Sequence, residues 1–463
     1  MAKNYHKKAK EQKRERSSGT ISTASTIVKK EHISFQLLWL FVILLLFIPI
    51  LSFKNKAEKL LNGEIAKSIK PKFIVGTWFN GDYQKQYEEY VKDNWPFKEK
   101  LTRFNNQLDY SLFNKIHVDG FISGKEQYVF SKAYIQAAMG QDYSGDSIIA
   151  EKVRKIKTIQ DTLKKKNIDL VIVYAPGKGS FYPEYIPDQY KVSNGKTNIA
   201  DFLQQSKLKG INYLDLHTYF MNIKNTSKYP LFPQYGHHWS YYGECVAADT
   251  IIKYIEALRK TDLPDFYWND VEVSDTCRSR DDDVVKSMNL IYKPSTFKMA
   301  YPKISFEENL QKNQTKVLSI ADSYYWGIVY MGILQKAFGN GGFWYYNNKV
   351  YPRVSQKNME VWELDLKQSI EQYNVILLFA ADGNLPTLGW GFIEDAYLLY
   401  TNPPKYYQYK KEKDRMSMYK KQIHEDSGIL NQVKKIAEEK RISLDSAINT
   451  EARRMMALEP KNN

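Results

Sequence analysis

The chain has 463 residues, of which 43% are hydrophobic and 26% are charged, a composition that is typical of folded proteins and excludes a wholly disordered one. The formal net charge of +15 is concentrated near the start, because residues 1–56 hold eleven lysines and arginines against three glutamates. The rest of the chain is only mildly basic, so we expect no nucleic-acid partner, although an anionic substrate or surface fits this charge. The two cysteines, Cys245 and Cys277, lack metal-ligand spacing, and a disulfide between them requires that the fold bring their Cα atoms close.

The first fifty residues predict a cytoplasmic tail and a membrane anchor. Residues 1–32 are basic and rich in Ser and Thr, which is typical of a disordered tail. Residues 33–53 carry no charge, and as a helix they would span about 30 Å, the thickness of the hydrocarbon core. The basic flank precedes this segment, so the positive-inside rule places the tail in the cytoplasm and the chain after about residue 54 outside. We predict an anchor rather than a cleaved signal peptide, because the segment is long and no small-residue cleavage site follows it.

Between the anchor and residue 145, the pattern predicts a linker, a helical stretch and a hairpin. Residues 56–70 have the composition of a short helical linker. From residue 73 to 113 aromatic residues recur at helical spacing, and Pro96 breaks this run or begins its second helix. Residues 120–130, GFISGKEQYVF, have glycines beside apolar residues and are typical of a tight β-hairpin.

From residue 146 to 404, short apolar runs alternate with amphipathic stretches. The runs predict strands over 169–174, 211–216, 316–320 and 374–379. The stretches predict helices over 147–166, 200–208, 243–259 and 324–338. This alternation predicts an α/β fold with a parallel sheet flanked by helices, in which the working site lies at the carboxyl ends of the strands. Residues 405–463 are expected to form a basic helical segment.

A serine follows the third of these strands, in the sequence VLSIADSYYW. A strand-to-helix turn would expose the hydroxyl of Ser323 at the sheet edge, next to the N–H groups and the positive end of the following helix. That arrangement suits a nucleophile with part of an oxyanion hole. Helix capping by Asp322 or Ser323 would explain the same residues without any catalysis.

Two adjacent histidines stand in a glycine- and aromatic-rich loop, GHHWS, before the predicted helix 243–259. A histidine can deprotonate a serine hydroxyl near neutral pH, and the chain has only seven of them. Packed or solvent-facing histidines would give the same dipeptide. A rival D-x-H sequence occurs at Asp215-Leu216-His217, but Asp215 is expected to cap the helix that follows.

The order of FISGKEQYVF, VIVYAPGKGSFYPEYIP, GHHWS and IADSYYW resembles that of the AlgX/AlgJ-like alginate O-acetyltransferases, also called DHHW-type proteins. The resemblance covers most of residues 73–400 and implies an SGNH-hydrolase-like domain. It implies that Ser323 is the nucleophile that accepts an acetyl group and that His238 is its general base. It also implies an enzyme that acetylates a polysaccharide acceptor, with a membrane-bound O-acyltransferase as partner. Together with the predicted anchor, this gives a membrane-anchored, periplasmic or extracellular enzyme, for which we expect no cofactor or metal.

The chain departs from the family pattern D-x-H-W, because Gly236 stands where the acid is expected. Losing the carboxylate that orients the imidazole can cost about 10⁴ in turnover. Three explanations stay open: another acid replaces it, a backbone carbonyl holds the ring, or the protein is a weak or inactive enzyme that binds polysaccharide or a partner. Asp322 is our first candidate for the acid, beside Glu244 and the cluster Asp281–Asp283. A carbohydrate esterase would use the same serine and histidine with water as acceptor.

Weaker candidates stand near the predicted strand ends. His237 adjoins the base, and Lys178 in a Pro-Gly-Lys turn could bring a cation and free N–H groups to the site. The side-chain amide of Asn384 could donate to an oxyanion, although turn chemistry is the favoured interpretation. Four tryptophans are candidate platforms for sugar rings, with core packing as the default for each: Trp239, Trp326, Trp344 and Trp390.

Overall fold

The computed structural model describes residues 36, 38–43, 60–63, 67–95, 97–278, 280–308, 312, 315–352 and 359–458. They form two compact units, one comprising residues up to Ser111 with Asn289–Tyr292, the other comprising Leu112–Met288 and the chain from Lys293 onward. No helix within these residues has both the length and the apolar character needed to cross a membrane. The predicted tail over 1–32 and most of the predicted anchor over 33–53 lie outside the described residues.

The first unit is helical, as the aromatic spacing predicted. Its helices are α2 (Val75–Phe79), α3 (Asp82–Asn94) and α4 (Lys98–Phe113), the last of which runs past the unit boundary. The predicted break near Pro96 is confirmed by the end of α3 and the start of α4. The predicted helical linker over 56–70 is wrong in its described residues, which form turns and extended chain. Gly63 there has a left-handed φ of 96°, and Asn62 donates its N–H to Asn289 at 2.8 Å instead of to a helical turn.

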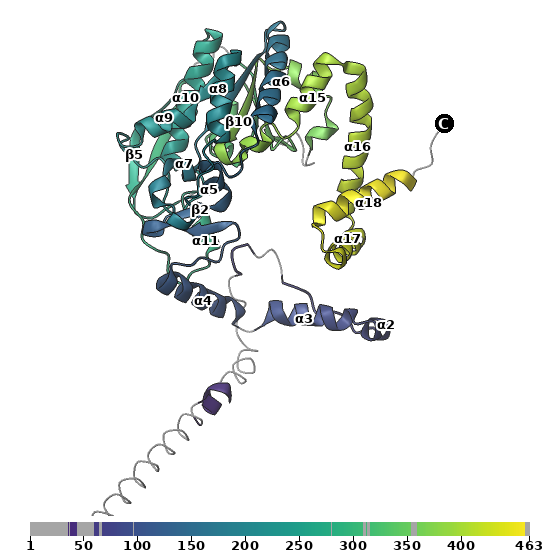
Figure 1. Ribbon diagram of the computed structural model, residues 1–463. Coiled ribbons are helices and arrows are strands. Elements are labelled where there is room, and N and C mark those ends of the chain that lie inside the picture. Colours follow the sequence, from purple (N-terminus) through teal and green to yellow (C-terminus); the bar gives the residue numbers. More distant parts are fainter. Residues whose placement is uncertain are drawn as a thin grey trace, which may run out of the picture. The chain divides into compact units, whose positions relative to one another are not determined.

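The second unit is built on a six-stranded sheet (Figure 1). In spatial order its strands are β4 (Tyr213–Asp215), β3 (Asp169–Ala175), β10 (Val375–Ala381), β7 (Val317–Ala321), β8 (Gly342–Tyr345) and β9 (Lys349–Tyr351). The first five are parallel and β9 is antiparallel to β8. The four predicted strands are therefore confirmed. The pair β8–β9 was not predicted, because a four-residue and a three-residue strand leave too little pattern to detect.

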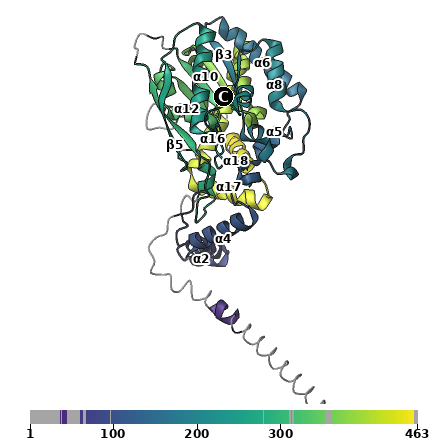
Figure 2. The ribbon, with the colours of Figure 1, turned by 90° about the vertical axis from the view of Figure 1, so that its left-hand side faces the viewer.

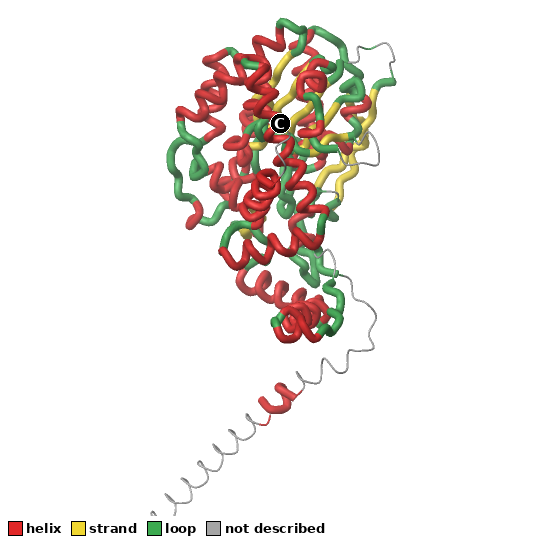
Figure 3. The backbone as a smooth tube through the Cα atoms, turned by 90° about the vertical axis from the view of Figure 1, so that its right-hand side faces the viewer, coloured by secondary structure: helices red, strands yellow, loops and turns green. Residues whose placement is uncertain are grey.

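Helices cover both faces of the sheet, because the buried strands alternate their side chains between two apolar cores. One core contains α9 (Leu216–Ile223), α10 (Tyr241–Arg259), α12 (Trp326–Tyr330) and α13 (Ile333–Lys336). The other contains α6 (Asp146–Lys164), α8 (Asn198–Lys209), α14 (Leu366–Glu371) and α15 (Phe392–Thr401). Figures 2 and 3 show these layers around the strands. The α/β fold predicted from the alternation is confirmed.

Shorter elements surround the carboxyl edge of the sheet. The predicted hairpin is confirmed as β1 (Phe121–Ser123) and β2 (Val129–Ser131), followed by α5 (Lys132–Ala138). After β3 comes α7 (Lys178–Phe181), and the 3-10 turns that matter below are η4 (Ser323–Tyr325), η5 (Val361–Glu363) and η6 (Asp382–Thr387). The predicted helix 324–338 is broken in two, because Gly332 adopts a left-handed φ of 81° between α12 and α13.

A second hairpin, β5 (Phe266–Ser274) with β6 (Met299–Phe306), was not predicted. Its strands are separated by a long connection that holds α11 (Asp283–Ser287), so no tight-turn signal marks it. The predicted helical end of the chain is confirmed as α16 (Pro403–Glu425), α17 (Ser427–Lys440) and α18 (Leu444–Leu458). These three helices share a small apolar core of their own, around Ile423, Val433 and Ala452.

Candidate active site

Ser323 lies where the sequence predicted it, at the carboxyl end of β7. The strand ends at Ala321, Asp322 caps the next turn by accepting the N–H of Tyr324 at 3.0 Å, and Ser323 opens that turn, η4. The turn is a short 3-10 segment, so the predicted long helix with its dipole does not follow Ser323 directly. The side chain of Ser323 is half-buried, while Asp322 and Tyr324 on either side are buried completely. The hydroxyl therefore sits at the edge of the sheet on a rigid support.

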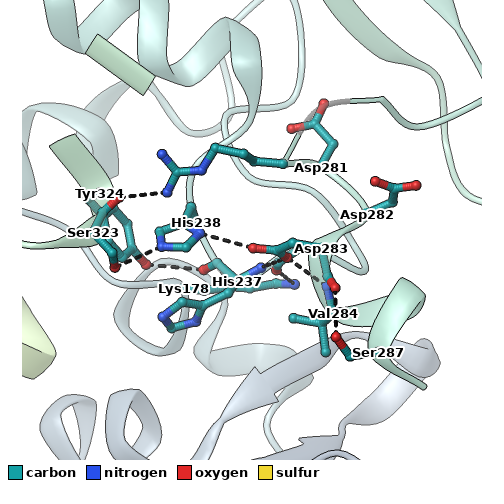
Figure 4. A network of polar contacts seen from close by, with 12 residues as sticks. Lys178, His237, His238, Asp281, Asp282, Asp283, Val284, Ser287, Ser323 and Tyr324 are labelled. Carbon is teal, nitrogen blue, oxygen red and sulfur yellow. Dashed lines mark hydrogen bonds and ion pairs between the residues drawn. The ribbon is translucent and has the colours of Figure 1, made fainter. Parts of the chain in front are cut away.

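His238 reaches the same edge from the loop between α9 and α10. The loop is held by Trp239, whose fully buried ring packs 5.4 Å from Tyr324, and by Ser240, which caps α10 by accepting the N–H of Gly243 at 2.9 Å. His238 Nε2 lies 2.9 Å from Ser323 Oγ (Figure 4). The structure thus brings together two residues that are 85 positions apart in the chain.

The other ring nitrogen of His238 faces Asp283, the first residue of α11. Nδ1 lies 3.1 Å from Asp283 Oδ2, and the second carboxylate oxygen accepts the N–H of His237 at 2.9 Å. Burial tends to raise the pKa of Asp283, but the hydrogen bond and charge interaction with His238 and the hydrogen bond from the N–H of His237 outweigh it, so the pKa lies below the ordinary 3.8. Asp283 is therefore ionised at neutral pH and can hold the imidazole in one tautomer.

The three consecutive aspartates have three different roles. Asp281 accepts the N–H of Tyr241 at 3.1 Å and supports the start of α10. Asp282 pairs with Lys286 at 2.6 Å and Lys293 at 2.9 Å, on the far side of the backbone. Asp283 alone among them meets His238, as Figure 4 shows. The sequence offered the cluster as a candidate but gave no means of choosing among its members.

Gly236 explains why the acid comes from another segment. An added Cβ at Gly236 would lie 2.9 Å from the carbonyl oxygens of both Arg280 and Asp281, and 2.6 Å from Pro233. The backbone that leads to Asp283 therefore passes through the space that any side chain at position 236 would need. Because Gly236 has no side chain, residues 280 and 281 can pack against it, and the carboxylate of Asp283 then lies beside Nδ1 of the His238 ring.

This packing predicts that restoring an acid at position 236 will not restore the family arrangement. We expect Gly236→Ala to destabilise the protein by about 1–3 kcal/mol through overpacking. Gly236→Asp should cost more, because it also places a carboxylate against two carbonyl oxygens, and its ester turnover should fall below that of Gly236→Ala. Thermal midpoints and turnover of a small acetyl ester measure the two effects. A stable and more active Gly236→Asp variant would contradict this interpretation of the loop.

The structure does not support Asp322 as the acid that orients the imidazole. Its carboxylate is fully buried and accepts the N–H of Ala381 and the side-chain amide of Asn384, both at 2.8 Å. It thus ties the end of β7 to the end of β10, and burial raises its pKa to about 6. Glu244 is also elsewhere, buried 3.6 Å from Arg280, and burial raises its pKa to about 8. The carboxylate of Asp322 is thus engaged by Ala381 and Asn384, and that of Glu244 lies against Arg280. Neither is among the hydrogen-bond partners given above for His238.

Lys178 holds the loop that carries His238 through hydrogen bonds to the loop backbone. Its side chain is 2% exposed, and Nζ donates to the carbonyl of Gln234 at 2.7 Å and to that of Gly236 at 2.9 Å. Burial lowers the pKa of Lys178 to about 7, although the negative charge of Asp283 opposes this shift. Lys178 is therefore close to the site, as predicted, but it acts on the backbone two residues before His238 rather than on the reacting atoms.

Two residues that the sequence did not single out fix the surroundings of Ser323. Arg280 donates to the carbonyl of Ser323 at 2.7 Å. Tyr346 lies in the turn after β8, and its phenol interacts with the side chain and the backbone of Ser323, which opposes the rise in its pKa that burial causes. Its hydroxyl is therefore a candidate donor for an oxyanion beside the nucleophile. The strand-like run FWYY before Asn347 and Asn348 was the signal that could have revealed Tyr346.

The remaining candidates have mainly structural positions. Burial lowers the pKa of His237 to about 3, so its ring stays neutral, packed 4.8 Å from Tyr134. Asn384 donates to Asp322 and to the hydroxyl of Tyr134 at 3.1 Å, so its amide is engaged away from Ser323. Trp239 and Trp344 are core residues, and Trp326 is half-buried against Phe343. Trp390 lines a pocket described below.

No metal or disulfide joins this site in the part of the chain that the structure describes. Cys245 is buried beside Met331, with the two sulfurs 3.6 Å apart, and Cys277 is also free. The described residues contain no group of three or more His, Cys, Asp or Glu side chains placed to hold a metal ion. Hydroxyl, imidazole and carboxylate are thus in line, an arrangement that could activate a serine as a nucleophile.

Known proteins resemble the region that carries this site. Residues 122–278 match the family model "SGNH hydrolase-like domain, acetyltransferase AlgX". The chain is 26% identical over 188 residues to the probable alginate O-acetylase AlgJ of Pseudomonas aeruginosa, covering 40% of this chain and 45% of that protein. It is also 26% identical over 181 residues to the same-named protein of Azotobacter vinelandii, covering 39% and 44%. The matched region thus spans less than half the length of these relatives.

Among solved structures, the O-acetyltransferase domain of Pseudomonas putida AlgJ is 16% identical, with a TM-score of 0.41 over 60% of this chain and 98% of that one. The structure of Pseudomonas aeruginosa AlgX is 11% identical, with a TM-score of 0.39 over 59% and 67%. The match to the family model begins in β1 and includes the loop that carries His237 and His238. Residues 122–278 are therefore similar to the SGNH hydrolase-like domain of the AlgX acetyltransferases, the resemblance that the sequence motifs predicted.

Proposed function

We propose that the protein is a membrane-anchored, extracytoplasmic O-acetyltransferase that acetylates hydroxyl groups of an exported or cell-surface polysaccharide. The observation that carries the proposal is the line of contacts from Ser323 Oγ to His238 Nε2 at 2.9 Å and from His238 Nδ1 to Asp283 at 3.1 Å. The names of the relatives, alginate O-acetylases, support the same reaction class. With Asp283 beside the imidazole, the glycine at position 236 does not by itself imply an inactive enzyme.

The reaction would proceed through an acyl-enzyme in two steps. In the first, His238 takes the proton of Ser323, whose oxygen attacks the carbonyl carbon of the acetyl donor, and the donor alcohol leaves with that proton. The N–H of Ser323 and the hydroxyl of Tyr346 would stabilise the oxyanion of the tetrahedral intermediate. In the second step, His238 deprotonates a sugar hydroxyl, which attacks the acetyl group and releases Ser323.

The apolar segment over residues 33–53 supports an anchor that keeps the enzyme at the membrane. An anchored enzyme would lie next to a membrane-bound O-acyltransferase, the partner that the family resemblance implies as the source of acetyl groups. Labelling with a reagent that does not cross membranes tests the orientation. Lysines after about residue 54 should react in intact cells, whereas those before residue 32 should react only after lysis.

The pKa of His238 predicts the pH dependence of turnover. Burial lowers this pKa below the ordinary 6.5, the charge of Arg280 adds to the effect, and Asp283 opposes it. Since the general base must be neutral, we expect kcat/KM to rise with pH and to reach half its maximum below pH 6.5. Asp283→Asn should move the midpoint of its residual activity further down, because the carboxylate raises the pKa of His238. A midpoint above 6.5 in the wild type would contradict this assignment.

The decisive experiment offers the full-length protein in detergent an activated acetyl ester, with and without an oligosaccharide acceptor. We expect a covalent acetyl group on Ser323 by mass spectrometry, followed by acetylation of sugar hydroxyls that exceeds release of free acetate. Acetate release alone, unchanged by acceptor, would assign a carbohydrate esterase instead. Equal background rates in the wild type, Ser323→Ala and His238→Ala proteins would leave only a binding role.

A further inference from the structure

A pocket of about 270 Å³ lies between the edge of the sheet and helix α16, and Tyr346 is one of its lining residues. Four segments form its walls: the turn after β8, the chain around Trp362, the chain around Trp390, and the face of α16 that carries Tyr409. All of them belong to the second unit, and α15 leads directly into α16 there (Figure 1). Its volume lies below the roughly 300–1,000 Å³ that is usual for drug-sized ligands, so it suits a single ring.

Tyr346 connects this pocket to the candidate active site. Its phenol interacts with Ser323, its ring packs 5.0 Å from that of Trp390, and both Tyr346 and Trp390 line the pocket. Asn347 donates its side-chain amide to the carbonyl of Trp390 at 3.1 Å and so fixes the two walls to each other. Tyr346 therefore interacts with Ser323 and also contributes to the wall of the pocket in which a ligand would lie.

The backbone of both walls contains left-handed residues. Trp390 has a φ of 45° between Gly389 at 82° and Gly391 at 89°, which gives three consecutive left-handed residues. A bulky residue in this region costs on the order of 1–3 kcal/mol. Tyr346 and Asn347 have φ values of 50° and 49°, which are usual for the central residues of a tight hairpin turn. The glycines flanking Trp390 allow the loop to present its ring to the pocket.

The lining of the pocket has apolar faces, polar groups and no net charge. Its aromatic residues include Trp362, Trp390 and Tyr409. Both lysines are matched by aspartates, Lys410 with Asp414 at 2.6 Å and Lys413 with Asp395 at 2.5 Å. Such paired charges give no preference for an anionic ligand.

The aromatic rings and polar groups of the lining fit a sugar. A pyranose ring has apolar C–H faces that pack on aromatic rings and a rim of hydroxyls that donate and accept. Its chemistry therefore matches the walls of the pocket.

We propose that this pocket binds one neutral pyranose unit of the acceptor glycan, next to the unit whose hydroxyl attacks the acetylated Ser323. The inference rests on the proposed transferase function and extends it by naming a subsite and the class of sugar. Bound there, the glycan would be held on the Tyr346 side of the nucleophile, so that a neighbouring ring reaches Ser323.

The test uses full-length Ser323→Ala protein, which separates binding from chemistry. Cellotetraose, the tetramer of N-acetylglucosamine and a tetrameric uronate are titrated and followed by tryptophan fluorescence and calorimetry. We expect saturable binding of at least one neutral oligosaccharide and weaker binding of the uronate. In the same background, Tyr409→Ala should weaken the affinity about tenfold, equivalent to loss of one good contact.

The chain provides a matched control for this variant. Tyr407 stands two residues earlier on α16 and is similarly exposed, 48% against 46% for Tyr409, but it does not line the pocket. Tyr407→Ala should bind as tightly as the parent. Equal losses in the two variants, tighter binding of the uronate, or no saturable binding of either neutral oligosaccharide would each overturn the proposal. Failure of the transferase function itself would appear separately, as absence of ester turnover in protein with Ser323 intact.

Discussion

Replacing Ser323 by alanine is expected to reduce acetyl transfer to the uncatalysed background, a loss of at least about 10³-fold in kcat. The physical reason is that Ser323 Oγ is the atom that would form the covalent ester, and the imidazole 2.9 Å away has no other hydroxyl to activate among its hydrogen-bond partners in the described structure. The fold should be unaffected, because the side chain is half-buried and small. Turnover of an activated acetyl ester and the thermal midpoint measure the two properties.

A reagent that needs no acceptor makes this result specific. Ser323 Oγ should attack the sulfur of phenylmethylsulfonyl fluoride, release fluoride and the serine proton, and form a sulfonyl ester. Mass spectrometry should detect this single adduct on the peptide that contains Ser323. Ser193, an exposed serine of the same unit, provides the control: Ser193→Ala should retain both turnover and labelling. Labelling that persists in Ser323→Ala at the same stoichiometry, or full turnover in that variant, would rule out this nucleophile.

Asp283→Asn is expected to lower kcat by about 10³–10⁴-fold while leaving the protein folded. The amide keeps the size of the carboxylate, but its nitrogen cannot accept the proton of His238 Nδ1, and no negative charge then stabilises the imidazolium. The same change also weakens the contact in which Asp283 accepts the N–H of His237. The loss should therefore appear in kcat more than in KM, and its pH midpoint should shift downward as described above.

Asp282→Asn is the matched control, since the two aspartates are adjacent and only one meets the ring. Asp282 pairs with Lys286 and Lys293, so its substitution should lower the thermal midpoint but leave kcat within a few-fold of the wild type. A kcat in Asp283→Asn close to that of Asp282→Asn would show that the imidazole does not depend on this carboxylate. Either a backbone carbonyl would then orient the imidazole of His238, or the protein would be a weak or inactive enzyme.

The amino-acid sequence by itself predicted the fold class and the two residues, Ser323 and His238, that the structure brings together. Buried runs such as 169–174 and 374–379 have a pattern that only a strand covered on both faces explains, and helical periodicity between them forces parallel crossovers. Parallel strands place their carboxyl ends at one edge, which is why Ser323 and the loop with His238 could be expected to meet. Short motifs with a fixed order also identified the family that the match over residues 122–278 supports.

Only the tertiary structure decided which acid faces the histidine and what surrounds the serine. Asp281, Asp282 and Asp283 are three consecutive residues of the same type, so the sequence does not distinguish them. Their roles differ because the backbone of residues 280–281 packs against Gly236, and the carboxylate of Asp283 then faces the ring of His238. Asp322 was misjudged because local spacing cannot show that its oxygens are consumed by Ala381 and Asn384 on a neighbouring strand. The contact between Tyr346 and Trp390 could not be predicted, since it joins two segments that are distant in the sequence.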